Sequence, residues 1–172
     1  MIKKAVQEAF NEQIKNEIYS SYLYLSMHAH FTSANLSGFA NWMRVQSGEE
    51  WLHAMKLYDF LLDRGGKAIL QAIPQPPTDF KSPLEIMQQV YEHEQHVTES
   101  IHKLYEVATK EADYPAQVML HWFINEQVEE EKNASEIVER LKIFGDNPAA
   151  LFEIDQELKT RVAAPAGAEA AA

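Results

Sequence analysis

The sequence predicts an all-α fold, a bundle of four long helices followed by a short fifth helix near the C-terminus. Four long segments are rich in Glu, Gln, Lys, Leu, Met and Ala, which are good helix formers. Glycine and proline fall mainly between these segments, and no stretch has the pattern of paired strands. Apolar residues recur along each segment at alternating steps of three and four. Each helix therefore has one apolar stripe, and four such stripes can bury one another in a bundle.

The first two helices are expected to form an antiparallel hairpin. Their apolar stripes run over Phe10–Phe31 and Phe39–Phe60. A short polar turn at Thr32–Asn35 separates them, and Ser37 is a candidate N-cap for the second helix. Gly48 lies inside that helix, where a glycine costs about 1 kcal/mol relative to alanine.

The third and fourth helices are expected to form a second antiparallel hairpin. Their stripes run over Leu84–Ala108 and Ala116–Phe144, with a turn at Asp113–Pro115 between them. The third helix begins with the pattern of an N-cap serine, a first-turn proline and a capping-box glutamate at residues 82–85.

A connection of about 19 residues joins the two hairpins and contains Pro74, Pro76 and Pro77. Extended at about 3.3 Å per residue, it can run the length of the bundle, so we expect a long crossover. A fifth helix is expected over Pro148–Leu158. Residues 1–162 are expected to form one domain, and the alanine-rich residues 163–172 a disordered tail.

The composition excludes several classes of protein. The formal net charge of −11 disfavours a nucleic-acid partner, which requires a basic surface to neutralise phosphates. The absence of cysteine excludes a disulfide scaffold, thiolate metal ligands and thiol catalysis. The first residues lack the apolar core of a signal peptide, and polar residues interrupt the uncharged stretch Ile18–Met43 throughout. We therefore expect a cytoplasmic protein with no membrane span.

Each apolar stripe becomes polar near its middle, and the residues responsible are Glu17, Glu50, His53, Glu94, Gln127 and Glu130. Glu17 and Glu50 are 33 residues apart, as are Glu94 and Gln127, so the two hairpins form a pseudo-repeat. The midpoints of these pairs, 33.5 and 110.5, fall in or beside the expected turns. Because residues equidistant from a hairpin turn lie level, and residues three apart share a helix face, the six side chains converge at mid-height in the core.

Such a polar layer requires compensation. A buried carboxylate costs several kcal/mol unless it is paired or coordinated, and the stripes carry no lysine or arginine opposite these glutamates. A pair of divalent metal ions would offset the cost, and oxygen ligands with one imidazole suit iron or manganese. The alternative is a hydrogen-bonded network of protonated carboxylates without metal.

The motifs around these residues resemble those of the bacterial and archaeal non-haem ferritins over about residues 3–160. The matching segments are Asn11–Gln13, Glu17–Tyr24, Gly38–Met43, Glu49-Glu50 with His53, Tyr91–Glu94, and Trp122-Phe123 to Glu131. The resemblance implies a ferritin-like four-helix bundle that serves in iron storage and detoxification. It implies a ferroxidase that oxidises Fe²⁺ with O₂ or H₂O₂ at a diiron centre within each subunit, followed by mineralisation of ferric oxyhydroxide inside a cage.

The resemblance also implies individual roles. The ligands of one iron would be Glu17, Glu50 and His53, with Gln127 close by. Those of the second iron would be Glu50, Glu94 and Glu130, with Glu50 bridging the two. A third iron site would be formed by Glu49, Glu126, Glu129 and Glu130, although a solvated acidic face is the alternative for the first three. Tyr24 resembles the tyrosine beside the diiron centre, an electron donor, with plain core packing as the alternative. His93 and His96 are expected to be surface residues.

The helical pattern has four other interpretations. A haem-containing bacterioferritin has a methionine after the second-helix glutamate, where this chain has Trp51, so no haem is expected. A DNA-protecting mini-ferritin is disfavoured because its metal site lies between subunits, whereas here the candidate ligands lie on all four helices of one chain. A cytokine-like bundle leaves the mid-stripe carboxylates unexplained. A diiron oxidase or peroxidase without storage remains the alternative function.

Storage requires an enclosed cavity, so a homo-oligomeric cage is expected, and the resemblance implies 24 subunits. The fifth helix carries more apolar surface than one bundle requires, including Leu151, Phe152, Ile154 and Leu158. The resemblance places this helix at symmetry axes of the shell and the crossover at the dimer two-fold axis.

Overall fold

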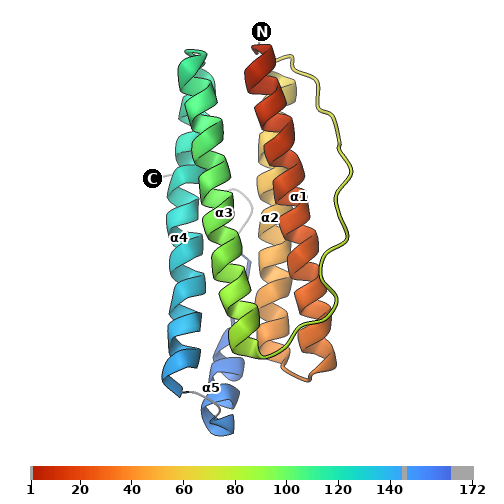
Figure 1. The fold of residues 1–172 in the computed structure, drawn as a ribbon, viewed down its shortest axis with the longest axis vertical. Coiled ribbons are helices and arrows are strands. Elements are labelled where there is room, and N and C mark those ends of the chain that lie inside the picture. The colour runs from red at the N-terminus through yellow and green to blue at the C-terminus, as the bar shows by residue number, and fades with distance from the viewer. Residues whose placement is uncertain (1, 145–146, 164–172) are drawn as a thin grey trace.

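The computed structural model describes residues 2–144 and 147–163, and within these residues every regular element is a helix. The helices are α1 (Lys4–Ser33), α2 (Ser37–Asp63), α3 (Pro83–Lys110), α4 (Tyr114–Phe144) and α5 (Pro148–Leu158). The first two helices form one antiparallel hairpin and α3 with α4 forms the other, while α5 packs at the end where α1 turns into α2 (Figure 1). The predicted bundle of two hairpins with a fifth helix is confirmed.

The crossover between the hairpins, residues 64–82, runs along the outside of α1 from one end of the bundle to the other (Figure 1). As a result, α2 and α3 run in the same direction. The Asn11 side chain fixes the start of the crossover, since it donates to the Lys67 carbonyl at 3.0 Å and accepts from the Ile69 amide at 2.6 Å. Further along, the Ser26 hydroxyl donates to the Pro77 carbonyl at 2.7 Å.

The predicted cap of α3 is confirmed, but the predicted cap of α2 is wrong. The Ser82 hydroxyl accepts from the Glu85 amide at 3.2 Å. In α2, by contrast, Ser37 is the first helical residue and the preceding residue makes no side-chain cap. A carboxylate oxygen of Asp155 in α5 instead accepts from the amides of Gly38 and Phe39, at 2.8 and 3.1 Å. The free amides of a helix N-terminus need acceptors, and here a distant segment supplies one.

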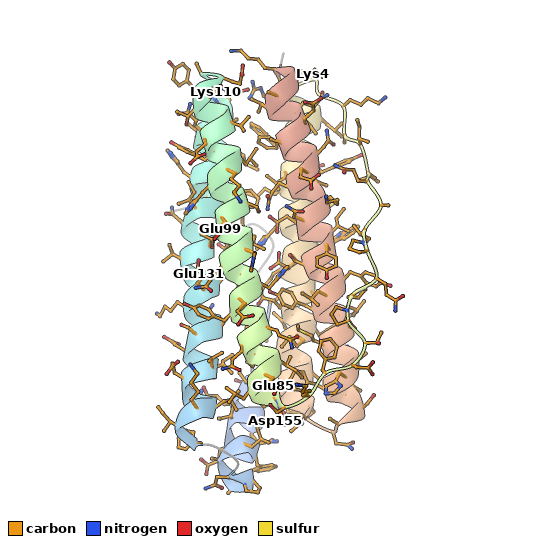
Figure 2. The ribbon with its side chains drawn as sticks, in the orientation of Figure 1. Lys4, Glu85, Glu99, Lys110, Glu131 and Asp155 are labelled. Atoms are coloured by element: carbon orange, nitrogen blue, oxygen red, sulfur yellow. The ribbon has the colours of Figure 1, made fainter. Side chains whose placement is uncertain are left out.

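Two apolar clusters fill the core, one on each side of a polar layer. One is built around Phe31, Phe39 and Met43, toward the end where α5 packs. The other is built around Phe10 and Leu61, toward the N-terminal end of α1. In Figure 2, Lys4 and Lys110 mark one end of the bundle, and Glu85 and Asp155 the other.

Two sequence predictions reach beyond the described residues. Apart from residue 163, the tail expected over 163–172 lies outside them, as do residues 145 and 146 of the turn before α5. Among the helices that are described, none combines the length and the apolar character needed to cross a lipid bilayer.

Candidate metal centre

The six mid-stripe residues meet in the core, as the spacing predicts. Helix α1 supplies one of them, α2 two, α3 one and α4 two. All six are at most 4% exposed: Glu17, Glu50, His53, Glu94, Gln127 and Glu130. The bundle therefore buries four carboxyl groups, one imidazole and one amide in a single layer between its two apolar clusters.

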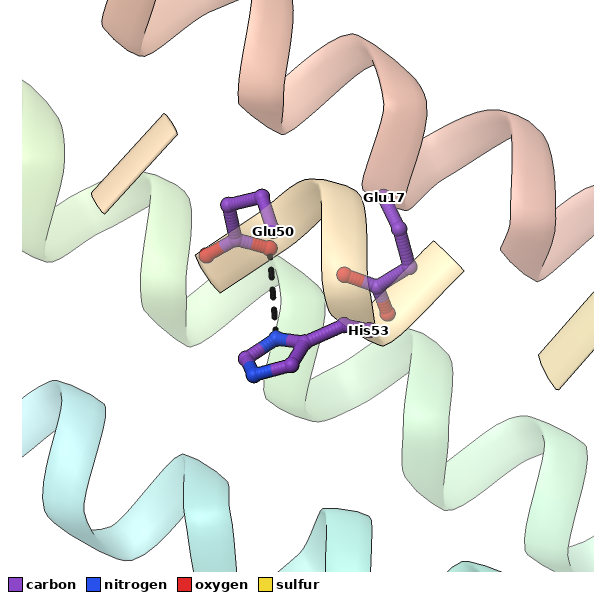
Figure 3. A group of neighbouring side chains, drawn as sticks. All are labelled: Glu17, Glu50 and His53. Atoms are coloured by element: carbon purple, nitrogen blue, oxygen red, sulfur yellow. Dashed lines mark ion pairs between the residues drawn. The ribbon is translucent and has the colours of Figure 1, made fainter. Parts of the chain in front are cut away.

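The first hairpin contributes Glu17, Glu50 and His53, which point toward one another (Figure 3). One ligand atom from each lies within 4.8 Å of the others, close enough for a single metal ion to join them. His53 Nδ1 lies 3.6 Å from Glu50 Oε2. Among the described residues, Glu17 Oε2 and Glu50 Oε2 are buried oxygens without a hydrogen-bond partner. Unpartnered buried oxygens of this kind suit an oxygen-binding cation.

The second hairpin contributes Glu94 and Gln127, and their level alignment is confirmed. The Gln127 amide donates to the Glu94 backbone carbonyl at 3.2 Å and to its carboxylate at 3.3 Å. The Tyr24 hydroxyl, which comes from the first hairpin, also donates to the Glu94 carboxylate. This hydrogen bond joins the two hairpins at the centre.

Two glutamines beside the centre, Gln46 and Gln13, were not predicted from the sequence to be site residues. Gln46 donates to Glu130 Oε2 at 2.7 Å and to Glu50 Oε1 at 3.4 Å, and thus joins α2 to α4. Gln13 donates to Glu17 Oε1 at 2.7 Å. A signal was available, because each glutamine precedes its glutamate by one helical turn and the two are themselves 33 residues apart.

Burial dominates the protonation of the centre. It raises the pKa values of Glu17, Glu50 and Glu94, and for Glu17 the charge of Glu50 raises the value further. Burial, with Glu94 adding to it, raises the pKa of Glu130 to about 8. Without metal, burial therefore favours the protonated forms of these carboxyl groups. A divalent cation would bind by replacing those protons, so the donor set fits a carboxylate-bridged metal pair.

Comparison with known proteins agrees with this geometry. Residues 7–144 match the family model described as a ferritin-like domain. The chain belongs to the ferritin family.

Curated relatives of this ferritin include a bacterial non-heme ferritin of Bacteroides fragilis, 44% identical over 94% of the chain and 100% of the relative. Another, from Staphylococcus haemolyticus, is 38% identical over 94% of the chain and 97% of the relative. Similar solved structures include an engineered closed form of the Archaeoglobus fulgidus ferritin, 49% identical with a TM-score of 0.94 over 95% of this chain and 100% of the other. An open-pore ferritin of the same archaeon has a TM-score of 0.93 and 49% identity, covering 94% of this chain and 100% of the other.

The residues predicted for a third iron site are only partly together in this ferritin. Glu126 Oε1 lies 4.0 Å from His53 Nε2, and these two residues form a second compact group with Glu130. Glu49 lies outside that group and is bound by Arg161, whose Nη2 is 2.6 Å from Glu49 Oε2. Glu129 is exposed and also lies outside the group.

The prediction that His93 is a surface residue is wrong. Its Nε2 lies 2.7 Å from the Ser20 hydroxyl, and its ring packs edge-on against Tyr24 with the centroids 5.8 Å apart. Burial lowers the pKa of His93 to about 4, so the ring is neutral near pH 7. The stripe spacing places His93 beside Glu94 but does not reveal that α1 covers it. His96 is exposed, as predicted.

Proposed function

We propose that this chain is an iron-storage ferritin that oxidises Fe²⁺ at the six-residue centre. The observation that supports this most is the pair of buried, unpartnered oxygens on Glu17 and Glu50, within reach of His53. A purely structural network would be expected to supply a separate donor to each oxygen, whereas here the Glu17 and Glu50 carboxyl groups share one contact with each other beside His53. The assignment of Glu17, Glu50 and His53 to one iron, and of Glu50, Glu94 and Glu130 to the second, accounts for all five charged or imidazole groups of the layer.

In the proposed reaction, iron is the substrate. Carboxylates stabilise Fe³⁺ relative to Fe²⁺, and two adjacent ions together supply the two electrons that the oxidant accepts. Two Fe²⁺, O₂ and two protons give two Fe³⁺ and H₂O₂, and with H₂O₂ as the oxidant the product is water. Gln127 and Gln46 orient the ligands through their amide donors, since they bind Glu94, Glu50 and Glu130. Tyr24, hydrogen-bonded to Glu94, is the proposed electron donor beside the centre.

The third iron site proposed for this ferritin consists of Glu49, Glu126, Glu129 and Glu130. Glu126 and Glu130 already lie next to His53. Glu49 and Glu129 would join them through side-chain rotation, and Glu49 would first have to leave Arg161.

Storage further requires a closed assembly, and we propose a cage of 24 subunits. Phe152 on α5 is 63% exposed, although Ile154 and Leu158 of the same helix are buried. Ile69 and Leu70 of the crossover are also exposed. Apolar side chains at two separated places suit the repeated contacts of a symmetric shell. The similar solved structures include an open-pore ferritin of Archaeoglobus fulgidus and a closed form of the ferritin of that archaeon made by mutagenesis.

Aerobic Fe²⁺ titration tests the ferroxidase assignment. The wild-type protein is expected to produce rapid ferric absorbance up to about two irons per chain, the number of sites in the proposed centre. Glu50→Ala removes the bridging ligand and is expected to abolish the rapid phase while the helices stay folded. Glu92→Ala, which alters an exposed glutamate, is the matched control and should behave as wild type. An unchanged initial rate in folded Glu50→Ala protein contradicts the assignment.

Two further measurements separate this function from its alternatives. Size-exclusion chromatography with light scattering should show a cage that retains many irons per chain. A monomer or dimer that retains only a few irons would indicate a diiron oxidase without storage. Haem supplementation should give no Soret band, since Trp51 occupies the position where bacterioferritins have a haem-binding methionine. We also propose a cytoplasmic location, which cell fractionation would test.

A further inference from the structure

The segment after α5 is fixed against α2 near the metal centre. The Asn41 side chain donates to the carbonyls of Leu158, Lys159 and Arg161, at 3.2, 3.3 and 2.9 Å. The amides of Thr160 and Arg161 are themselves bonded back to the end of α5. The backbone at Arg161 is therefore held in place independently of the contacts that its side chain makes.

The Arg161 guanidinium makes two different hydrogen bonds, one with each arm. Its Nη1 donates to Gln46 Oε1 at 2.8 Å, and its Nη2 donates to Glu49 Oε2 at 2.6 Å. Its Cζ lies 4.6 Å from the centroid of the Trp42 ring, which supports the flat group from one face. The side chains of Arg161 and Glu49 are 21% and 16% exposed, so the ion pair is largely shielded from water.

The contact with Gln46 has a directional consequence. A guanidinium can only donate hydrogen bonds, so it fixes the carbonyl end of the Gln46 amide toward itself. The nitrogen end then points to the centre, where it donates to Glu130 at 2.7 Å and to Glu50 at 3.4 Å. One arm of Arg161 thus orders ligands of the proposed diiron pair, while the other neutralises a carboxylate of the proposed third site.

We propose that Arg161 is a positioning residue that acts as a built-in competitor for iron. It occupies Glu49 while the third site is empty, and a cation that arrives there displaces it and frees the segment 159–161. The inference rests on the proposed function, because Glu49 belongs to the third site only under that assignment. Under this proposal, the guanidinium of Arg161 controls when Glu49 becomes available to bind a metal cation.

The competition follows from charge. Arg161 binds Glu49 through Oε2, so a divalent ion on the same carboxylate would share its negative charge with the guanidinium and be repelled by it, and each weakens the binding of the other by the same factor. Couplings of this kind are typically about 5- to 150-fold. Cation binding at Glu49 should therefore loosen the C-terminal segment, and removal of the guanidinium should tighten cation binding.

Calorimetric titration of the assembled, iron-free protein with Zn²⁺ tests the proposal, because Zn²⁺ is not redox-active and binding is measured apart from oxidation. In Arg161→Gln, the affinity of the third and weakest Zn²⁺ site is expected to rise on the order of tenfold, within the range typical of such coupling. Adding Glu49→Gln to this variant should remove the gain. Arg140→Gln is the matched control, since Arg140 holds the end of α5, directly before this segment, through Glu157, at 2.8 and 2.7 Å. It should leave the third site unchanged.

Hydrogen exchange gives a second readout. In the wild type, saturation with Zn²⁺ should speed exchange at the amides of Thr160 and Arg161, and Glu49→Gln should abolish this response. Two tight Zn²⁺ sites with a third that is unaffected by Arg161→Gln would overturn the inference and leave the proposed function standing. An equal gain in Arg140→Gln would also overturn it, because simple loosening of the segment would then explain the effect. Absence of the two tight sites in the wild type would contradict the proposed function itself.

Discussion

The metal centre should lower the stability of the protein whenever it is empty, and Glu50→Met tests this. Glu50 Oε2 is buried with no donor from a neutral or basic side chain, and burial, together with the nearby charges of Glu94 and Glu130, raises the pKa of Glu50 and disfavours its ionised form. Methionine has a similar length and a flexible apolar side chain, so it can fill the same space without a polar atom that needs a partner. The substitution removes the weaker bond of Gln46, at 3.4 Å, and the hydrogen bond between the Glu17 and Glu50 carboxyl groups, and it leaves the 2.7 Å bond of Gln46 to Glu130.

The size of the expected gain follows from the unpartnered oxygen that the substitution removes. An unsatisfied buried polar group costs about 1–3 kcal/mol, so metal-free Glu50→Met should unfold with a free energy larger by about that amount. For a chain of this size, 1 kcal/mol corresponds to about 2–4 °C, which predicts a melting temperature about 2–12 °C higher in a chelator. With Zn²⁺ at about 1,000 times Kd the order should reverse, because binding then adds about 4.1 kcal/mol to the wild type.

Thermal unfolding with and without Zn²⁺ measures both effects. Glu92→Met, at an exposed position, is the control and should shift stability by less than about 0.5 kcal/mol in either condition. Lower stability of metal-free Glu50→Met than of wild type, or an equal gain in stability from Zn²⁺ in both proteins, would contradict this prediction.

Three other substitutions or conditions give distinct outcomes. Gly38→Ala would place a methyl carbon 1.6 Å from the Asp155 carbonyl oxygen, so α5 must move, at a cost of about 1–3 kcal/mol, and hydrogen exchange should accelerate over residues 148–158. Gly48→Ala meets no atom within 4 Å and should raise the unfolding free energy by about 1 kcal/mol in denaturant titration. Because the pKa of Glu130 is raised from 4.5 to about 8, the folded metal-free protein binds more protons than the unfolded chain between these values. Its stability should therefore fall as pH rises from 5 to 8, and a flat or rising profile would contradict the assignment of buried, protonated carboxyl groups.

Sequence periodicity predicted the fold and the central residues because both depend on local spacing. The steps of three and four residues define the stripes, and the 33-residue spacing aligns Glu17 with Glu50 without knowledge of tertiary contacts. The long crossover, which makes α3 run in the same direction as α2, was predicted from its length alone.

The remaining contacts join residues far apart in the chain and leave no such periodic signal. Asp155 caps a helix 117 residues away, and Arg161 reaches Glu49 across 112 residues. His93 was misassigned for the same reason, since its covering partner, Ser20, comes from the other hairpin. Helical spacing describes which residues share a face, but not which element packs over that face.

We propose that two irons bind in the polar layer between the apolar clusters. Anomalous diffraction at the iron edge, from crystals soaked anaerobically in Fe²⁺, locates bound iron directly. Two strong peaks per chain are expected, one among Glu17, Glu50 and His53 and the other among Glu50, Glu94 and Glu130. An empty layer, or iron found only on exposed carboxylates, would contradict it.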